Sequence, residues 1–122
     1  MVADSGLVRT DRRREKRTAA VLAVALDTTD KQNRHGVTRD LSTTGLLVVT
    51  PSSFKRGDKV QVTVHAGGED LAVTGHVARV DENPVSSPEL WRWRVGIELE
   101  APLPSAFVER GVRVSRLPAT AS

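Results

Sequence analysis

The chain alternates hydrophobic with polar or small residues over most of its length after residue 18, a period typical of half-buried β-strands. The pattern predicts strands at residues 18–27, 37–42, 46–49, 60–65, 71–77 and 91–99. It is clearest in the last strand, where one face carries only large hydrophobic residues: Trp91, Trp93, Val95, Ile97 and Leu99. A polar turn is predicted at 27–33 and a hairpin turn at Gly67-Gly68.

Six strands with short connections and no long helix predict an all-β fold, either a small antiparallel barrel or a sandwich. Near the C-terminus, residues 105–110 are expected to form one or two turns of a short helix. Val112 and Val114 are then expected to add a short strand. Closing the sheet into a barrel would remove the exposed strand edges that favour aggregation.

The composition is that of an ordinary globular domain, since 39% of the 122 residues are hydrophobic and 27% are charged. We expect one domain at residues 11–117, a flexible segment at 1–10 and a tail at 118–122. The chain has no cysteine, which excludes disulfides and thiolate metal sites. No apolar run has the length of a membrane span or a signal peptide, so a cytoplasmic protein without membrane insertion is expected.

The net charge of +3 hides one strongly basic segment near the N-terminus. Residues 9–17 carry six basic and two acidic side chains, a local charge of +4, whereas the rest of the chain sums to −1. This segment has no apolar face to dock, so it is predicted to be a flexible, extended arm. A patch this local favours a small anionic ligand over a broad DNA-binding face, and a solvated charged tail is the simpler alternative.

The second predicted strand carries candidate ligand-binding groups. Val37 and Leu41 are expected to share one face, and Thr38, Asp40 and Ser42 the other. The Asp40 carboxylate could accept hydrogen bonds from the N1–H and exocyclic amine of guanine, and the Ser42 hydroxyl could bond the same base or a phosphate. Asp and Ser are also common before a hairpin loop, so a purely structural turn is the alternative interpretation.

The glycine that follows and the basic arm would complete such a site. Gly45 would allow a positive φ, so the backbone could turn tightly beside a ligand. Arginine side chains pair bidentately with phosphate and with the O6/N7 edge of guanine, and they stack on purine faces. The arm and the strand together therefore predict a site for an anionic ligand that carries guanine.

These two motifs, in this order, resemble those of the PilZ domain family. They are Arg13-x-x-x-Arg17 and, some twenty residues later, Asp40-x-Ser42-x-x-Gly45. The last predicted strand, Arg94-Val95-Gly96-Ile97-Glu98-Leu99, is similar to the closing motif of that family, with Leu99 where Phe is common. The resemblance covers roughly residues 11–100 and implies a six-stranded antiparallel β-barrel that binds cyclic di-GMP, a bacterial second messenger.

The resemblance also implies roles for the motif residues. Arg13 and Arg17 would hold phosphates and guanine, whereas Asp40, Ser42 and Gly45 would hold a guanine edge on the barrel surface. In this family an Arg just before the first motif often accompanies an intercalated ligand dimer, and Arg12 occupies that place. Three consecutive arginines, Arg12, Arg13 and Arg14, leave the register of the first motif open.

A receptor that is not an enzyme is the leading interpretation. Its arm would become ordered over cyclic di-GMP, and an effector protein, which the sequence does not identify, would recognise the changed surface. One alternative is a nucleic-acid-binding protein that uses the arm, although nucleic acid is the less favoured partner. Another is a degenerate PilZ module that keeps the fold and only contacts proteins.

No other chemistry is predicted, and no cofactor or metal is expected. The three histidines, His35, His65 and His76, do not have metal-ligand spacing. The chain has neither a phosphate loop of the Walker type nor a recognisable nucleophile motif. Trp91 and Trp93 lie on the apolar face of the last strand, which favours a place in the barrel core over stacking on a base.

Overall fold

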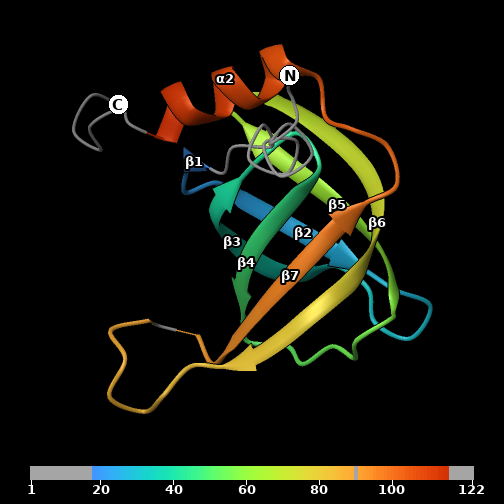
Figure 1. The fold of residues 1–122 in the computed structure, drawn as a ribbon, viewed down its shortest axis with the longest axis vertical. Helices are drawn as coiled ribbons and strands as arrows, with labels where there is room; N and C mark the ends of the chain where they lie inside the picture. Colours follow the sequence, from blue (N-terminus) through green and yellow to red (C-terminus); the bar gives the residue numbers. More distant parts are fainter. Residues whose placement is uncertain (1–17, 90, 116–122) are drawn as a thin grey trace, which may run out of the picture.

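The computed structural model describes residues 18–89 and 91–115 (Figure 1). Its elements are β1 (Thr18–Ala19), β2 (Ala23–Asp27), β3 (Arg34–Leu41), β4 (Gly45–Thr50), β5 (Lys59–Ala66), β6 (Glu69–Glu82), β7 (Trp93–Leu99) and α2 (Ser105–Ser115). All the strand pairings are antiparallel. Strands thus dominate the described part of the chain, and the predicted all-β class is confirmed.

Six of the strands form a closed barrel. Its order is β3-β2-β5-β6-β7-β4, and the pairing of β4 with β3 closes the ring. Strand β1 lies outside this ring and pairs with the end of β3 that β2 leaves uncovered. The predicted six-stranded antiparallel barrel is therefore confirmed.

Aliphatic side chains fill the barrel, as the scarcity of aromatic residues requires. Alternate residues of each strand point inward, and the most deeply buried are Leu26, Leu41, Leu46, Val48, Val60, Val62, Val64, Val77 and Val95. Phe54, in the loop between β4 and β5, is also buried in this core. Trp93 packs against the core, whereas Trp91 precedes β7 and is not part of the core cluster.

Helix α2 lies across one end of the barrel (Figure 1). Phe107 and Gly111 are its buried residues, and a Cβ at Gly111 would approach Leu22 Cδ1 to 2.9 Å. The predicted helical turns are thus confirmed and extend further, but the predicted strand at Val112 and Val114 is wrong. Two valines two residues apart fit a strand locally, but in the helix Phe107, Gly111 and Val114 recur at i, i+4 and i+7 along one face, and Val112 lies away from that face.

The first predicted strand is interrupted, because the side chain of the buried Thr38 takes the place of backbone hydrogen bonds between strands at Ala20 and Leu22. The Thr38 hydroxyl donates to the Ala20 carbonyl (2.6 Å) and accepts from the Leu22 N–H (2.9 Å). Ala20 and Leu22 are both buried, whereas Val21 between them is 54% exposed. The prediction of one strand over 18–27 is therefore wrong, and the segment forms β1 and β2 with a side-chain-bonded break between them.

Two β-bulges change the alternation of inward and outward residues. In β3 the register shifts between Thr38 and Asp40, so Thr38 and Leu41 both point into the core although they are three residues apart. The expectation that Leu41 shares a face with Val37 is wrong for this reason. In β6 the register shifts between Val77 and Arg79, with Ala78 as the extra residue.

Positive backbone φ angles mark the tight turns of the described chain. Gly67 and Gly68 have φ angles of 61° and 86°, which confirms the predicted hairpin turn between β5 and β6. Asn33 has a φ of 54° at the end of the polar turn that joins β2 to β3. Its N–H donates to the Asp27 carboxylate (2.6 Å), which closes this turn.

Candidate ligand-binding site

Four residues form one row across the outer face of the barrel, from β3 to β6. Asp40 pairs with Leu47, Leu47 with Gly96, and Gly96 with Arg79. Neighbouring strands lie about 4.8 Å apart, so three steps place the backbones of Asp40 and Arg79 about 14 Å apart along the sheet. The register of the sheet thus puts a carboxylate and a guanidinium at opposite ends of one row.

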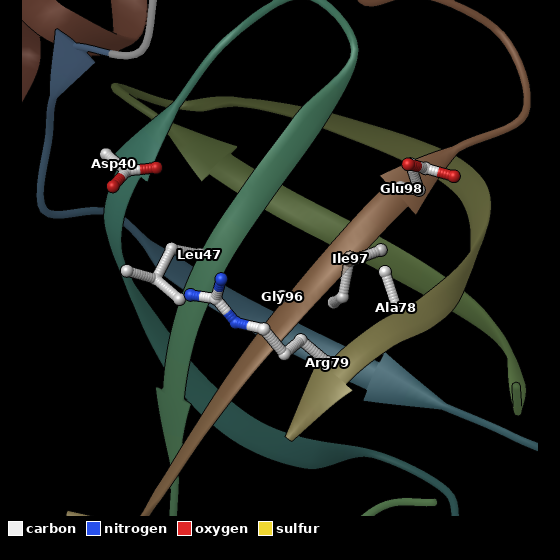
Figure 2. A pocket seen from close by; sticks show the side chains of 7 residues that line it. All are labelled: Asp40, Leu47, Ala78, Arg79, Gly96, Ile97 and Glu98. Carbon is white, nitrogen blue, oxygen red and sulfur yellow. The ribbon is translucent and has the colours of Figure 1, made fainter. Parts of the chain in front are cut away.

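This row lies in a shallow pocket of about 260 Å³ on the barrel surface (Figure 2). Figure 2 shows Asp40 at one end and Arg79 extending across Gly96 toward Leu47. The other lining residues are Ala78, Ile97 and Glu98. Because Gly96 has no side chain, the middle of the row is flat, and a planar base could lie there.

The pocket is not cationic by itself. Among the described residues that line it, Arg79 is the basic one, whereas Asp40 and Glu98 are acidic. The Arg79 side chain is 70% exposed, and its Nε lies 3.2 Å from Oδ2 of Asp81. An anionic ligand would therefore need further positive charge from outside the pocket.

The loop from Ser42 to Gly45 is folded around the serine hydroxyl. Ser42 is only 2% exposed, and its Oγ accepts the N–H groups of Thr44 (3.2 Å) and Gly45 (3.1 Å). The Ser42 N–H in turn donates to the Gly45 carbonyl (3.0 Å). These bonds account for the serine at this position, and they direct the hydroxyl into the loop.

Gly45 does not use the positive φ that a glycine would allow. The described glycines with a positive φ are Gly57, Gly67 and Gly68. Gly45 instead begins β4 and pairs with Glu98 of β7. The tight turn depends on the hydrogen bonds of Ser42 rather than on a left-handed glycine.

The same loop also fixes the chain that leaves the barrel. The Leu99 N–H donates to the Thr44 carbonyl (2.9 Å), and the Leu103 N–H donates to the Thr43 carbonyl (2.7 Å). The end of β7 and the segment before α2 are therefore fastened to the loop that carries the motif.

Strand β1 pairs with the end of β3 that carries Asp40. Thr18 pairs with Leu41, and Ala19 pairs with Asp40. The three predicted arm residues, Arg12, Arg13 and Arg17, lie outside the described residues. Arg17 nevertheless directly precedes Thr18 in the chain, so the covalent attachment of the arm lies beside the motif strand.

The bulge next to Asp40 is held by an ion pair. Arg39 Nε donates to Glu89 Oε2 (2.7 Å), and Arg39 Nη2 pairs with Glu89 Oε1, which joins β3 to the loop between β6 and β7. The hydrogen bond from Arg39 lowers the pKa of Glu89, and the bond to Glu89 raises the pKa of Arg39. Both shifts indicate that the charged forms are stabilised together.

The predicted site residues that the structure describes lie in two places, the pocket lining and the adjacent loop. Asp40 lines the pocket, whereas Ser42 and Gly45 build the adjacent loop. The sequence pattern did not identify Arg79 or Leu47 as candidates. Their signal is the sheet register, which places them in line with Asp40 although β6 and β3 are far apart in the chain.

Within residues 18–89 and 91–115, no group of three His, Asp or Glu side chains is placed to hold a metal ion. In the same part of the chain, no helix has the length and apolar character needed to cross a membrane.

Comparison with known proteins identifies the family. The model of the PilZ domain matches residues 11–110, and the chain therefore belongs to the PilZ domain family. The resemblance of the two sequence motifs to this family is thereby confirmed. No match is found among curated proteins.

Solved structures share the fold at low sequence identity. The PilZ domain of YcgR from Escherichia coli, solved with cyclic di-GMP, is 17% identical with a TM-score of 0.65 and coverage of 85% of this chain and 91% of that one. The PilZ domain of CeSA from a cellulose-synthesizing bacterium is 20% identical, with a TM-score of 0.51 and coverage of 81% and 93%.

A third structure is larger than this chain. The Bacillus subtilis inhibitor of motility MotI/DgrA is 20% identical with a TM-score of 0.62 over 80% of this chain. The match covers 48% of that protein, so this chain spans about half of its length.

Proposed function

We propose that the chain is a receptor for cyclic di-GMP that binds the ligand on the outer face of the barrel between Asp40 and the basic arm. The observation that carries this proposal is the pairing of β1 with β3, which attaches the arm beside Asp40 and its loop. The PilZ domain of YcgR, which has the same fold, was solved with this ligand. The proposed ligand-binding residues are Arg12, Arg13, Arg17, Asp40, Ser42 and Gly45.

The chemistry of the pocket suits guanine. The Asp40 carboxylate accepts from the N1–H and exocyclic amine of one base, which adenine does not offer in this arrangement. Ser42 and Gly45 contribute by fixing the loop beside that base. Leu47 and Gly96 provide an apolar, flat surface for the ring.

The phosphates require the arm. The described lining has two carboxylates and one guanidinium, so the pocket alone would repel a ligand with two phosphates. Arg13 and Arg17 supply the missing charge and bidentate donors, and Arg12 adds a contact to a second, intercalated ligand molecule. Binding therefore orders the arm against the barrel.

Ordering of the arm is the signal. The protein acts in the cytoplasm without catalysis, and an effector protein recognises the surface formed by the arm and the bound ligand. An arm that served to bind nucleic acid would instead need no carboxylate at Asp40, which would repel a phosphate backbone.

Titration calorimetry of the whole chain with cyclic di-GMP tests the proposal. We expect binding by the wild type and a loss of about 3–6 kcal/mol in Arg13→Ala/Arg17→Ala, because two charge-assisted contacts are removed. Arg92→Ala/Arg113→Ala removes the same charge away from the pocket and should bind as the wild type does.

Two results would contradict the receptor proposal. One is the absence of heat with cyclic di-GMP in a folded wild-type protein. The other is tight binding of duplex DNA at physiological salt that survives Asp40→Asn and is lost in the double arginine variant, which would establish a nucleic-acid-binding function. A folded protein that binds neither ligand would support a module that only contacts proteins.

A further inference from the structure

The far end of the row holds a cation that no sequence motif includes. Arg79 lies in line with Asp40 because two bulges set the register, one in β3 and one in β6. Without a change of register, the core would impose strict alternation, so the bulge at Ala78 places two consecutive residues, Ala78 and Arg79, at the pocket.

The surroundings of Arg79 leave its guanidinium available to a ligand. The side chain is 70% exposed, and its ion-pair partner Asp81 is itself 56% exposed on the same strand. An exposed ion pair of this kind contributes little to stability, so a structural role does not account for the position of Arg79. Figure 2 shows the side chain directed over Gly96 rather than away from the pocket.

The ends of the row are chemically complementary to guanine. Asp40 is an acceptor for the donor edge of the base, which carries N1–H and the exocyclic amine. The neighbouring edge of the same ring carries the acceptors O6 and N7, which an arginine fork binds bidentately. Arg79 reaches across Gly96 toward Leu47, and Asp40 lies beyond Leu47 at the other end of the row, so a base on this surface would lie between the two head groups.

We propose that Arg79 is a ligand-contacting specificity residue that binds the O6/N7 edge of the guanine whose donor edge is held by Asp40. This inference rests on the proposed function, because it assumes that cyclic di-GMP occupies the pocket. It assigns the barrel itself one cationic contact in addition to those of the arm. On binding, the guanidinium exchanges Asp81 for the base.

A ligand analogue isolates this contact. The probes are cyclic di-GMP and the same cyclic dinucleotide with N7 of each guanine replaced by C–H, measured by titration calorimetry on the full chain. We expect the wild type to bind the analogue roughly tenfold more weakly, the effect of one lost hydrogen bond to a charged donor. Arg79→Ala should bind cyclic di-GMP roughly tenfold more weakly or worse, and it should distinguish the two ligands less than the wild type does.

Two further variants test whether ligand recognition needs the bidentate geometry of the Arg79 guanidinium or only its positive charge. Arg79→Lys keeps the charge but not the bidentate geometry, so it should retain little of the N7 discrimination. Arg92→Ala, which removes another exposed and ion-paired arginine, should behave as the wild type does. Thermal unfolding of each variant checks that the fold is kept.

The possible failures are distinguishable. If the folded wild type does not bind cyclic di-GMP, the proposed function fails and this inference fails with it. If the wild type binds and Arg79→Ala binds equally well, or discriminates the N7 analogue as strongly as the wild type does, only the role of Arg79 is overturned. If Arg79→Lys discriminated the N7 analogue as well as the wild type does, the bidentate contact would be excluded and only a charge effect would remain.

Discussion

The two β-bulges at the ends of the pocket row differ in how they are held. The bulge in β3 is fixed on the inside by the buried Thr38 hydroxyl and on the outside by the ion pair of Arg39 with Glu89. For the bulge in β6, the structure shows an exposed ion pair between Arg79 and Asp81. One end of the row is therefore rigidly built, and the other relies on a weak surface contact.

The two ends of the row are therefore expected to respond differently to a ligand. Asp40 is held in position before a ligand binds, whereas Arg79 can move to meet it. A carboxylate that reads the donor edge of a base must be fixed, because a misplaced acceptor leaves buried donors unpaired. A long arginine can move to the ligand at small cost, because its partner in the unbound protein is exposed to solvent. The variants below test this contrast, from the largest expected effect to the smallest.

Thr38→Val should destabilise the rigid end most. The substitution keeps the shape of the side chain but leaves the Ala20 carbonyl and the Leu22 N–H without their partner. We expect a loss of about 2–4 kcal/mol in the free energy of unfolding, measured by urea denaturation. A matched Thr63→Val change, on the partly buried outer face of β5, should have little effect, and equal losses in both variants would contradict the bracing role.

Asp40→Asn should weaken ligand binding with little effect on the fold. The amide keeps the size of the carboxylate but loses its charge and presents donors toward the guanine donors. We expect a loss of about 1–3 kcal/mol in cyclic di-GMP binding by calorimetry. Unchanged affinity would show that the rigid end does not read the base.

Gly96→Ala should weaken ligand binding at the floor of the pocket without destabilising the barrel. A Cβ at Gly96 would lie 3.5 Å from Arg79 Cβ, an ordinary contact, so the unfolding midpoint should hardly change. The added methyl lies where the ring would rest, and we expect roughly 1 kcal/mol weaker binding of cyclic di-GMP.

Gly75→Ala is a control for Gly96→Ala, because it should destabilise the fold. A Cβ there would collide with the backbone carbonyl of Glu98, so this change should lower the unfolding midpoint markedly. If Gly96→Ala is destabilised as much as Gly75→Ala, the glycine of the row is structural and the flat-floor interpretation is wrong.

Glu89→Gln should have the smallest effect, and that effect should depend on pH. The pKa of Glu89 is lowered from its ordinary value of 4.5, mainly by the hydrogen bond from Arg39, so the pair stabilises the fold above that pH. This stability is lost as the pH falls through the lowered pKa. We expect at most about 1 kcal/mol between wild type and variant at pH 7, which should shrink below pH 4.5. A difference that is constant with pH would exclude an ionic contribution.

Sequence periodicity predicted the barrel well because most strands alternate regularly. It failed where a side chain or a bulge interrupts the ladder, as at Thr38, since alternation carries no information about an inserted residue. Val112 and Val114 were misassigned because two residues cannot distinguish a strand from a helix.

The same reasoning identified only some of the residues at the candidate site. Asp40, Ser42 and Gly45 form a contiguous motif, and their spacing reflects the loop that Ser42 closes. Arg79 belongs to no local pattern, because its position in line with Asp40 depends on three strand pairings across the barrel. Long-range register of this kind cannot be deduced from the spacing of residues within one segment.

The carbonyls of Thr43 and Thr44 have a consequence for where the domain ends. They accept hydrogen bonds from the N–H groups of Leu103 and Leu99, so the loop from Ser42 to Gly45 and the chain that leads into α2 are one hydrogen-bonded unit. A boundary drawn at the last barrel strand would remove the Leu103 donor, although it would remove no residue of the pocket. The smallest transplantable form of this surface therefore extends past the barrel, into the segment before α2 that is hydrogen-bonded to the Ser42–Gly45 loop.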